Sequence, residues 1–174
     1  APYYRFDGSN DVIDMGDEGD LEPRTTDFSL CAWIRQDIVA EEWFIGKIAG
    51  SGGSGEGYGM KVSSSGKLEL VFDERVHGGS LFTLESDSAI EADKWYHFVG
   101  IKDGITLKIY LNGVEQADTA NATADLDIET ASSFYIGTKV ASTSWWNGSI
   151  SGVQFYNLAL SATEVKELYS GASV

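Results

Sequence analysis

The segment KWYHFVGIKDGITLKIYLNGV, residues 94–114, carries the clearest structural signal in the chain. From residue 105 to residue 111, Ile or Leu occupies every second position, and Thr, Lys and Tyr stand between them. Because successive side chains of a strand point to opposite faces, this alternation predicts a half-buried strand. Asp103-Gly104 and Asn112-Gly113, on either side, are strong turn signals. We therefore expect residues 94–102 to form the hairpin partner of this strand.

Similar short segments recur on both sides of this hairpin, separated by glycine-rich or polar breaks. They lie at residues 3–6, 12–15, 28–35, 43–48, 57–62, 67–72, 80–84, 133–137 and 149–156. Strands at a spacing of about 8 to 12 residues predict an all-β sandwich or barrel. Segments 28–35 and 94–102 have apolar residues on both faces, so we expect these two strands to be central and covered on both sides.

One helix is predicted near the C-terminus. Ser161 and Glu164 have the spacing of a capping box, in which each residue satisfies a backbone amide of the other. After this cap, Val165, Leu168 and Tyr169 fall on one helical face. Gly171 supplies a C-terminal stop. The pattern indicates a short helix packed against the sandwich.

Composition excludes several classes of protein. The 174 residues include 27 acidic and 12 basic side chains, a net charge of −15, so a nucleic acid would be repelled. Hydrophobic residues make up 43 %, which is enough for a sizeable core. No stretch approaches the roughly 18 apolar residues of a membrane helix, so we expect no membrane insertion. Cys31 is the single cysteine, expected to be a buried thiol, and only two histidines accompany it, which argues against a zinc cluster.

The ordered motifs of the chain resemble a known family. They are YRFDG (4–8), FSLCAWI (28–34), KWYH (94–97), IYLNGV (109–114), YIG (135–137), NGSI (147–150) and FYNLALS (155–161). Together they are similar to laminin G-like domains of the concanavalin A-like lectin/glucanase superfamily. The resemblance implies an all-β fold, a two-sheet antiparallel jelly-roll sandwich with a short C-terminal helix, as a single domain over residues 1–174. It also implies loops or a concave face that bind sugars or protein partners.

The carboxylate pattern argues against an enzyme. Retaining glycosidases hold two carboxylates roughly 5 Å apart, and glucanase relatives carry them at alternating positions of one strand. The nearest stretch is ELVFDE, residues 69–74. There Glu69 and Asp73 share a face with Val71 between them, and Glu74 points away. We therefore predict that the catalytic carboxylate pair is missing and that the protein is not an enzyme.

Calcium is the one cofactor that the sequence leaves open. Residues 7–20 contain six acidic side chains, which are the hard oxygen ligands that calcium prefers. The family places an aspartate after the strand start at Gly148–Ile150, but Ser151 stands there. A solvated acidic loop is the favoured interpretation, with a calcium site as its alternative.

The five tryptophans must be divided between core and surface. Trp33, Trp95 and Trp146 lie in or beside the family motifs, and we expect all three in the core. Trp145 occupies a polar segment, where an exposed indole indicates a ligand contact. Trp43 either binds ligand or simply begins a strand.

The predicted ligand-binding residues combine apolar ring faces with hydrogen-bonding groups, since sugars present apolar C–H faces and hydroxyls. His97, in contrast, is predicted to be structural. For His77, the alternative to a ligand contact is an ordinary surface histidine. The predicted ligand-binding set is Trp145, Trp43, Tyr58, Arg75, His77 and Asn147.

The leading hypothesis for function is a non-catalytic carbohydrate-binding or adhesion module. Its partner would be a polysaccharide or glycan, and it would be displayed extracellularly, on a cell surface or on a virion surface. The alternative is a structural or decoration module that binds a protein surface in a virion or cell-surface assembly. A glycan-cleaving enzyme is a remote third possibility. The oligomeric state is left open.

Overall fold

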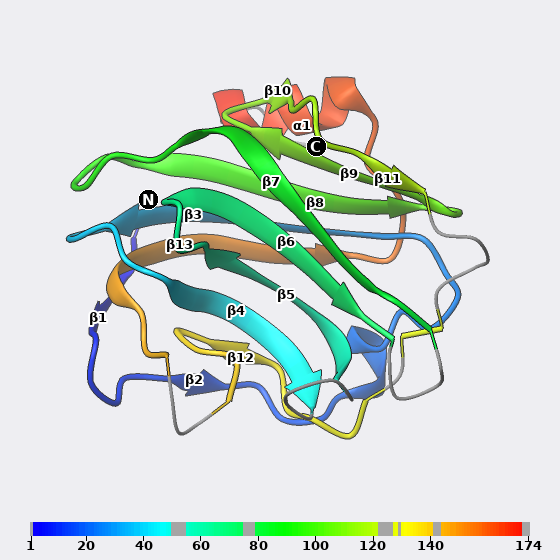
Figure 1. The fold of residues 1–174 in the computed structure, drawn as a ribbon, viewed down its shortest axis with the longest axis horizontal. Helices are drawn as coiled ribbons and strands as arrows, with labels where there is room; N and C mark the ends of the chain where they lie inside the picture. Colours follow the sequence, from blue (N-terminus) through cyan, green and yellow to red (C-terminus); the bar gives the residue numbers. More distant parts are fainter. Residues whose placement is uncertain are drawn as a thin grey trace.

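A computed structural model describes residues 2–49, 55–74, 79–121, 127–128, 130–140 and 144–171. Two antiparallel sheets form a sandwich with one short C-terminal helix (Figure 1). Both the predicted fold class and the predicted positions of the long strands are confirmed. Within the described residues, no helix has the length and apolar character needed to cross a bilayer.

Sheet A has seven strands. Its spatial order is β1 (Tyr4–Asp7), β13 (Asn147–Tyr156), β3 (Phe28–Gln36), β8 (Tyr96–Asp103), β9 (Thr106–Leu111) and β10 (Val114–Glu115), while β11 (Ala120–Asn121) also pairs with β9. The hairpin predicted from residues 94–114 is β8 and β9. Its turn lies at Gly104 and Ile105 rather than at Asp103-Gly104, so Ile105 is exposed instead of facing the core.

Sheet B has six strands and packs across sheet A. Its order is β2 (Ile13–Asp14), β12 (Tyr135–Ile136), β4 (Glu42–Ala49), β5 (Glu56–Val62), β6 (Lys67–Asp73) and β7 (Leu81–Ala89). A single turn of 3-10 helix, η1 (Gly19–Leu21), follows β2. The short strands β10 and β11 and the turn η1 are elements that the sequence did not predict.

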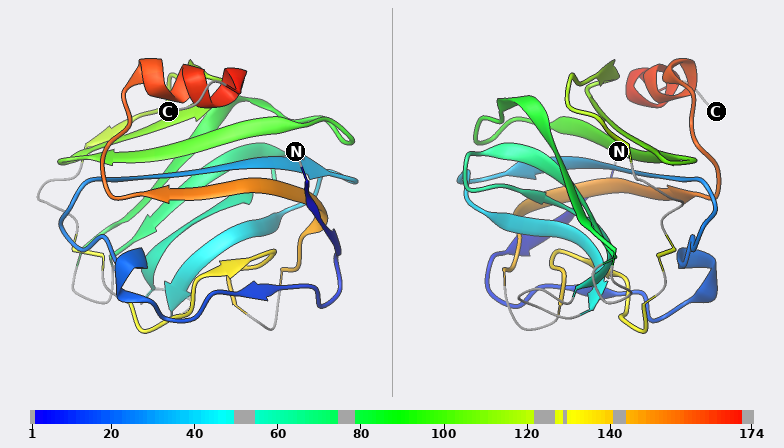
Figure 2. Two further views of the ribbon diagram at one scale, coloured as in Figure 1. Left: turned by 180° about the vertical axis from the view of Figure 1, so that it is seen from behind. Right: turned by 45° about the vertical axis from the view of Figure 1, so that its right-hand side comes forward.

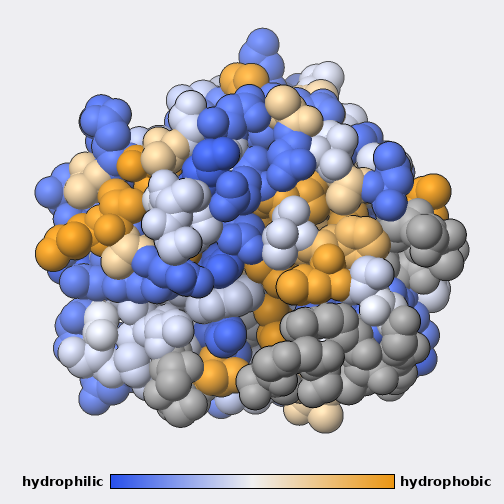
Figure 3. Space-filling view, in the orientation of Figure 1, coloured by the Kyte–Doolittle hydropathy of each residue, from blue (hydrophilic) through white to orange (hydrophobic). Residues whose placement is uncertain are grey.

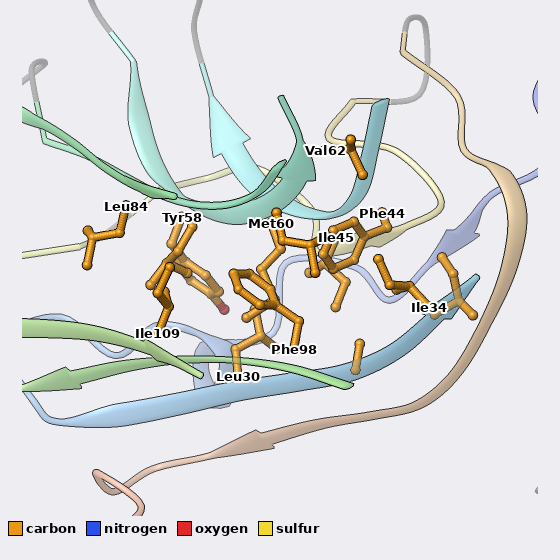
Figure 4. Packing of buried hydrophobic residues seen from close by; sticks show 14 of the residues in the cluster. Leu30, Ile34, Phe44, Ile45, Tyr58, Met60, Val62, Leu84, Phe98 and Ile109 are labelled. Atoms are coloured by element: carbon orange, nitrogen blue, oxygen red, sulfur yellow. The ribbon is translucent and has the colours of Figure 1, made fainter. Parts of the chain in front are cut away.

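The main core fills the space between the two sheets. Side chains from β3, β8 and β9 meet side chains from β4, β5 and β7 there (Figure 4). The labelled residues are Leu30, Ile34, Phe98 and Ile109 of sheet A and Phe44, Ile45, Tyr58, Met60, Val62 and Leu84 of sheet B. Trp146 is fully buried against Phe44, with ring centroids 5.4 Å apart, so its predicted core position is confirmed.

The helix α1 (Ala162–Ser170) covers the other face of sheet A, opposite to sheet B (Figure 2). Its capping box is formed as predicted: the Glu164 amide donates to Ser161 Oγ, and the Ser161 amide donates to Glu164 Oε2. Val165 packs on Cys31 and Val99, which explains why β3 and β8 are apolar on both faces. Burial raises the pKa of Cys31 to about 12, as expected for an inert thiol.

Two tryptophans lie outside the predicted core. Trp33 points to the outer face of sheet A, because Ala32 and Ile34 on either side of it face inward. Trp33 is therefore half-buried, and Trp95, just before β8, is 38 % exposed. The prediction that both are core residues is wrong.

Candidate functional site

The outward face of sheet B carries Trp43, one of the six predicted ligand-binding residues. Cross-strand pairing places its side chains in rows that run from β4 to β7. One row is Trp43, Lys61, Glu69 and Glu85, and the next is Gly46, Gly59, Val71 and Thr83. An aromatic residue, a lysine and two glycines therefore stand together on one face. Figure 3 shows patches of hydrophobic surface among hydrophilic side chains on this side of the molecule.

The indole of Trp43 packs closely on the sheet because the neighbouring strand has glycine at residue 59. A β-carbon at residue 59 would come within 2.9 Å of the Trp43 ring, so only glycine leaves room for this close approach. Ile48 and Val71 pack beside the ring and form with it a small apolar cluster on this face. Trp43 is 8 % exposed.

Two ammonium groups lie over the Trp43 ring. The Nζ atom of Lys139 is 5.0 Å from the ring centroid, and that of Lys61 is 5.6 Å from it. Both distances are within the range of cation–π attraction. Lys139 comes from the segment after β12, which crosses the face above Gly46, where a β-carbon would lie 2.5 Å from the Lys139 Cα.

Carboxylates hold Lys61 in place. Its ammonium group lies 3.0 Å from Glu41 and 3.4 Å from Glu69. Burial alone would lower the pKa of Lys61, but the hydrogen bonds and charges of these two carboxylates outweigh it and raise that pKa. Burial raises the pKa of Glu69 against the opposing effect of Lys61. The face is thus a partly desolvated network of charges around one aromatic ring.

The carboxylates on this face are arranged as ion pairs. Glu69 stands opposite Glu85 on the neighbouring strand, and each lies within 4.0 Å of a lysine, Lys61 and Lys67 respectively. Along β6, Glu69 and Asp73 share the face with Val71 between them, as the alternation predicted.

Three of the six predicted ligand-binding residues come from segments that lie side by side. The Trp43 amide donates to the carbonyl of Ser144, at 3.4 Å, which places the half-buried Trp145 in the segment next to Trp43. The Asn147 amide donates to Glu42 Oε2, 2.9 Å away. The beginning of β4 and the beginning of β13 therefore meet at this edge of the face.

The other three predicted residues are placed differently. Tyr58 is fully buried, and its hydroxyl donates to the Leu21 carbonyl at 2.7 Å. Burial raises the pKa of Tyr58. Tyr58 points into the core because Met60 and Val62 on the same strand also do, so we correct its proposed role as a ligand contact. Arg75 and His77 lie outside the described residues.

Lys61, Lys139 and Gly59 belong to this face but were not selected from the sequence. A lysine that lies beside an aromatic ring of the neighbouring strand, as Lys61 lies beside Trp43, can be identified only when the pairing register of the two strands is known. The two glycines inside predicted strands were the available signal, because glycine in a strand often marks a close approach.

The acidic segment 7–20 uses its carboxylates for local structure. Asp11 Oδ2 accepts from the Asp7 amide, Asp14 Oδ1 from the Gly16 amide, and Asp17 pairs with Lys47 at 2.6 Å. Within the parts of the chain that the structure describes, no group of three or more His, Cys, Asp or Glu residues is placed to hold a metal ion.

Comparison with known proteins identifies the architecture. The family model Laminin_G_3, described as the concanavalin A-like lectin/glucanases superfamily, matches residues 7–166. No curated protein matches the chain.

Solved structures with the same fold include several binding domains, all of low sequence identity. The CBM40 of the Ruminococcus gnavus IT-sialidase, bound to α2,3-sialyllactose, is 15 % identical with a TM-score of 0.76 and covers 97 % of this chain and 98 % of its own. Domain 4 of AbnA, a GH43 extracellular arabinanase from Geobacillus stearothermophilus, in complex with arabinotriose, is 17 % identical with a TM-score of 0.69. That match covers 97 % of this chain and 82 % of the arabinanase domain chain. The binding domain of Paraclostridial Mosquitocidal Protein 1 is 16 % identical with a TM-score of 0.76, and the match covers 95 % of this chain but 42 % of that one. These likenesses show that the chain shares its two-sheet fold with these domains.

Proposed function

Because the chain belongs to the Laminin_G_3 family of the concanavalin A-like lectin/glucanase superfamily, we propose that it is a single non-catalytic module that binds glycans. The proposed binding surface is the outward face of sheet B around Trp43. Trp145 and Asn147 lie at its edge, and Arg75 and His77 stay in the proposal as predicted from the sequence.

The observation that carries the proposal is the combination of Trp43 with Lys61 and Lys139. Trp43 is 8 % exposed, so a sugar ring would contact the exposed edge of the indole with its C–H groups while its hydroxyl or carboxylate oxygens accept hydrogen bonds from the ammonium groups. Both lysines already lie within 6 Å of the ring centroid, so the apolar and polar contacts converge on one spot. Lys61 is already paired with Glu41 and Glu69, so Lys139 is the lysine near the ring that has no ion pair within the described residues.

The structural neighbours support the same class of ligand. Two of them contain a bound oligosaccharide, and one belongs to an extracellular enzyme. We therefore propose that this module acts outside a cell or on the surface of a cell or virion, as a carbohydrate-binding or adhesion domain.

Titration calorimetry with α2,3-sialyllactose and arabinotriose, together with a glycan array, tests this proposal. Lys139→Ala removes a donor above Trp43 and is expected to weaken binding by about tenfold, the effect of losing one charge-assisted hydrogen bond. Lys166→Ala, which removes an exposed lysine of α1, is the matched control and should leave affinity unchanged.

The same experiment separates the alternatives. An array without hits, or equal effects of Lys139→Ala and Lys166→Ala, would contradict glycan binding at this face and favour a module that binds a protein surface. Release of reducing sugar would indicate an enzyme.

A further inference from the structure

A second aromatic site lies on the other side of the molecule, on the outer face of sheet A beside α1. It is a pocket of about 490 Å³, within the range typical of small-ligand sites. Its lining includes Tyr3, Trp33, Trp95, Ser151, Leu168 and Tyr169. In the view from behind, the N-terminal end and α1 both lie on this face of the sheet (Figure 2, left). Neither Trp43 nor any other residue of sheet B contributes to this lining.

Strand register brings the rings together. Ser151 pairs with Trp33 across β13 and β3, and Trp33 pairs with His97 across β3 and β8, so the three side chains form one outward row. Trp95 lies two residues before His97, at the entry to the same strand.

Two ring pairs frame the pocket. Tyr169 reaches down from α1 and stacks on Trp33, with centroids 5.6 Å apart and planes inclined by 20°. Tyr3, from the N-terminal segment, meets Trp95 edge to face at 5.8 Å. The pocket is therefore assembled from three separate parts of the chain: the sheet, the helix and the N-terminal segment.

The polar edges of these rings are free within the described part of the chain. No side-chain hydrogen bond is made there by the Tyr3 or Tyr169 hydroxyl or by the indole N–H of Trp33 or Trp95. Ser151 Oγ, in contrast, donates to the Pro2 carbonyl at 2.7 Å. Four donors at the edges of apolar ring faces match a ligand that presents C–H groups on its faces and oxygens around its rim.

The pocket carries no charge among its described lining residues. His97, next to Trp33 at 5.0 Å, is 2 % exposed, and burial lowers its pKa to about 4, so it is neutral at physiological pH. Arg35, further along β3, is already paired with Asp93 at 2.6 Å. A charged ligand would therefore find no residue of opposite charge among the described lining residues. A neutral ligand needs no such residue.

We propose that this pocket is a second binding site, which takes neutral saccharide rings. It goes beyond the proposed function because it is formed by different residues on the opposite side of the sandwich. A module with both sites would bind two glycan segments at once.

Titration calorimetry with cellotetraose, xylotetraose and chitotetraose tests the pocket. The wild-type protein should bind at least one of them, and Tyr3→Ala and Trp95→Ala should each weaken that binding by about tenfold through loss of a stacking ring. Tyr4→Ala is the matched control, because Tyr4 is the adjacent residue, has a similar exposure of 67 % against 58 % for Tyr3, and is not among the lining residues. Tyr4→Ala should leave this binding unchanged, and Lys139→Ala, on the opposite face, serves to tell the two sites apart.

Three results would overturn the proposal: no binding of any of the three tetrasaccharides, equal effects of Tyr3→Ala and Tyr4→Ala, or a loss confined to Lys139→Ala. The last result would assign these sugars to the face of sheet B instead. Both tyrosines are exposed, so neither variant removes a core side chain, and circular dichroism is used to check that each variant is folded. Tyr3 and Trp95 lie outside the Trp43 face. Failure of this proposal therefore does not contradict glycan binding at that face, and the two proposals can fail separately.

Discussion

The indole of Trp43 rests on the backbone of Gly59, and the two residues fit each other only because residue 59 lacks a side chain. A β-carbon there would lie 2.9 Å from the ring and 2.7 Å from the Ile45 carbonyl oxygen. The close packing of Trp43 on sheet B thus depends on a glycine in the middle of β5, where glycine otherwise weakens a strand.

Gly59→Ala should therefore disturb both the ring and the strand. We expect a shifted tryptophan emission maximum and a loss of about 2 kcal/mol in the free energy of unfolding, from crowding in a packed region. Gly19→Ala is the control, because a β-carbon at residue 19 meets nothing within 4 Å. If urea denaturation gave the same stability for both variants, the proposed packing of Trp43 on Gly59 would be wrong.

His97 makes stability depend on pH. Burial lowers its pKa to about 4 from the usual 6.5, so the folded state binds fewer protons than the unfolded state in this window. Stability is therefore fully present above pH 6.5 and is lost as pH falls towards 4, by up to about 3 kcal/mol. The rings of Trp33 and Tyr169 lie next to it, with centroids 5.0 and 6.1 Å from the imidazole.

His97→Phe should remove this contribution. Urea denaturation of both proteins between pH 4 and 7 checks it, since the difference between their unfolding free energies isolates the histidine from the many carboxylates. Parallel pH profiles for the two proteins would show that His97 is not the group responsible.

Lys47 is a buried cation that ties β4 to two loops. Its ammonium group is fully buried and donates to Asp17 Oδ1 at 2.6 Å and to the carbonyls of Thr130 and Ser132 at 3.2 and 2.6 Å. Lys47→Met leaves these acceptors without a donor, so we expect a loss of about 3 kcal/mol.

Lys108→Met provides the comparison for Lys47→Met. Lys108 pairs with Asp103 at 3.3 Å at the surface, where ion pairs contribute about 1 kcal/mol or less. Thermal or urea unfolding of both variants measures the difference. Similar losses for the two would mean that Lys47 does not hold the loops.

The capping box should stabilise α1 measurably. Ser161→Ala removes the oxygen that accepts from the Glu164 amide and should cost about 1 kcal/mol. Thr163→Ala, at an exposed position inside the helix, should have no cost because alanine is the better helix former. A fall in the melting temperature for Thr163→Ala as large as that for Ser161→Ala would contradict the assigned cap.

The fold was largely predictable from local pattern. Alternation in residues 105–111 identifies β9, and the Ser161 and Glu164 pair identifies the start of α1, because both signals depend on neighbours within a few residues. The apolar character of β3 on both faces also indicated a covering layer, which is α1. The turn differs from the prediction by one residue. The predicted turn residues are Asp103 and Gly104, whereas the structure has Gly104 and Ile105 in the turn, so Gly104 is the first turn residue rather than the second.

The candidate sites were less predictable because they depend on contacts between distant segments. Lys139 comes to Trp43 from a connection almost a hundred residues away, and nothing in the local sequence indicates this. The sequence predicts Trp33 in the core because it lies in one of the family motifs, FSLCAWI (28–34). Its position on the outer face follows from the alternation of side chains along β3, in which Ala32 and Ile34 face the core. The pocket beside Trp33 also needs Tyr169 of the helix, which stacks on it.

The central claim is that glycans bind at the Trp43 face of sheet B, and nuclear magnetic resonance tests it most directly. The labelled protein is titrated with the glycan that gives the strongest array signal, while the indole N–H of Trp43 and the amides of Gly59 and Lys61 are followed. Binding at this face predicts that these resonances shift progressively and saturate together. If they stay unmoved at a saturating glycan concentration, the face of sheet B is not the binding surface.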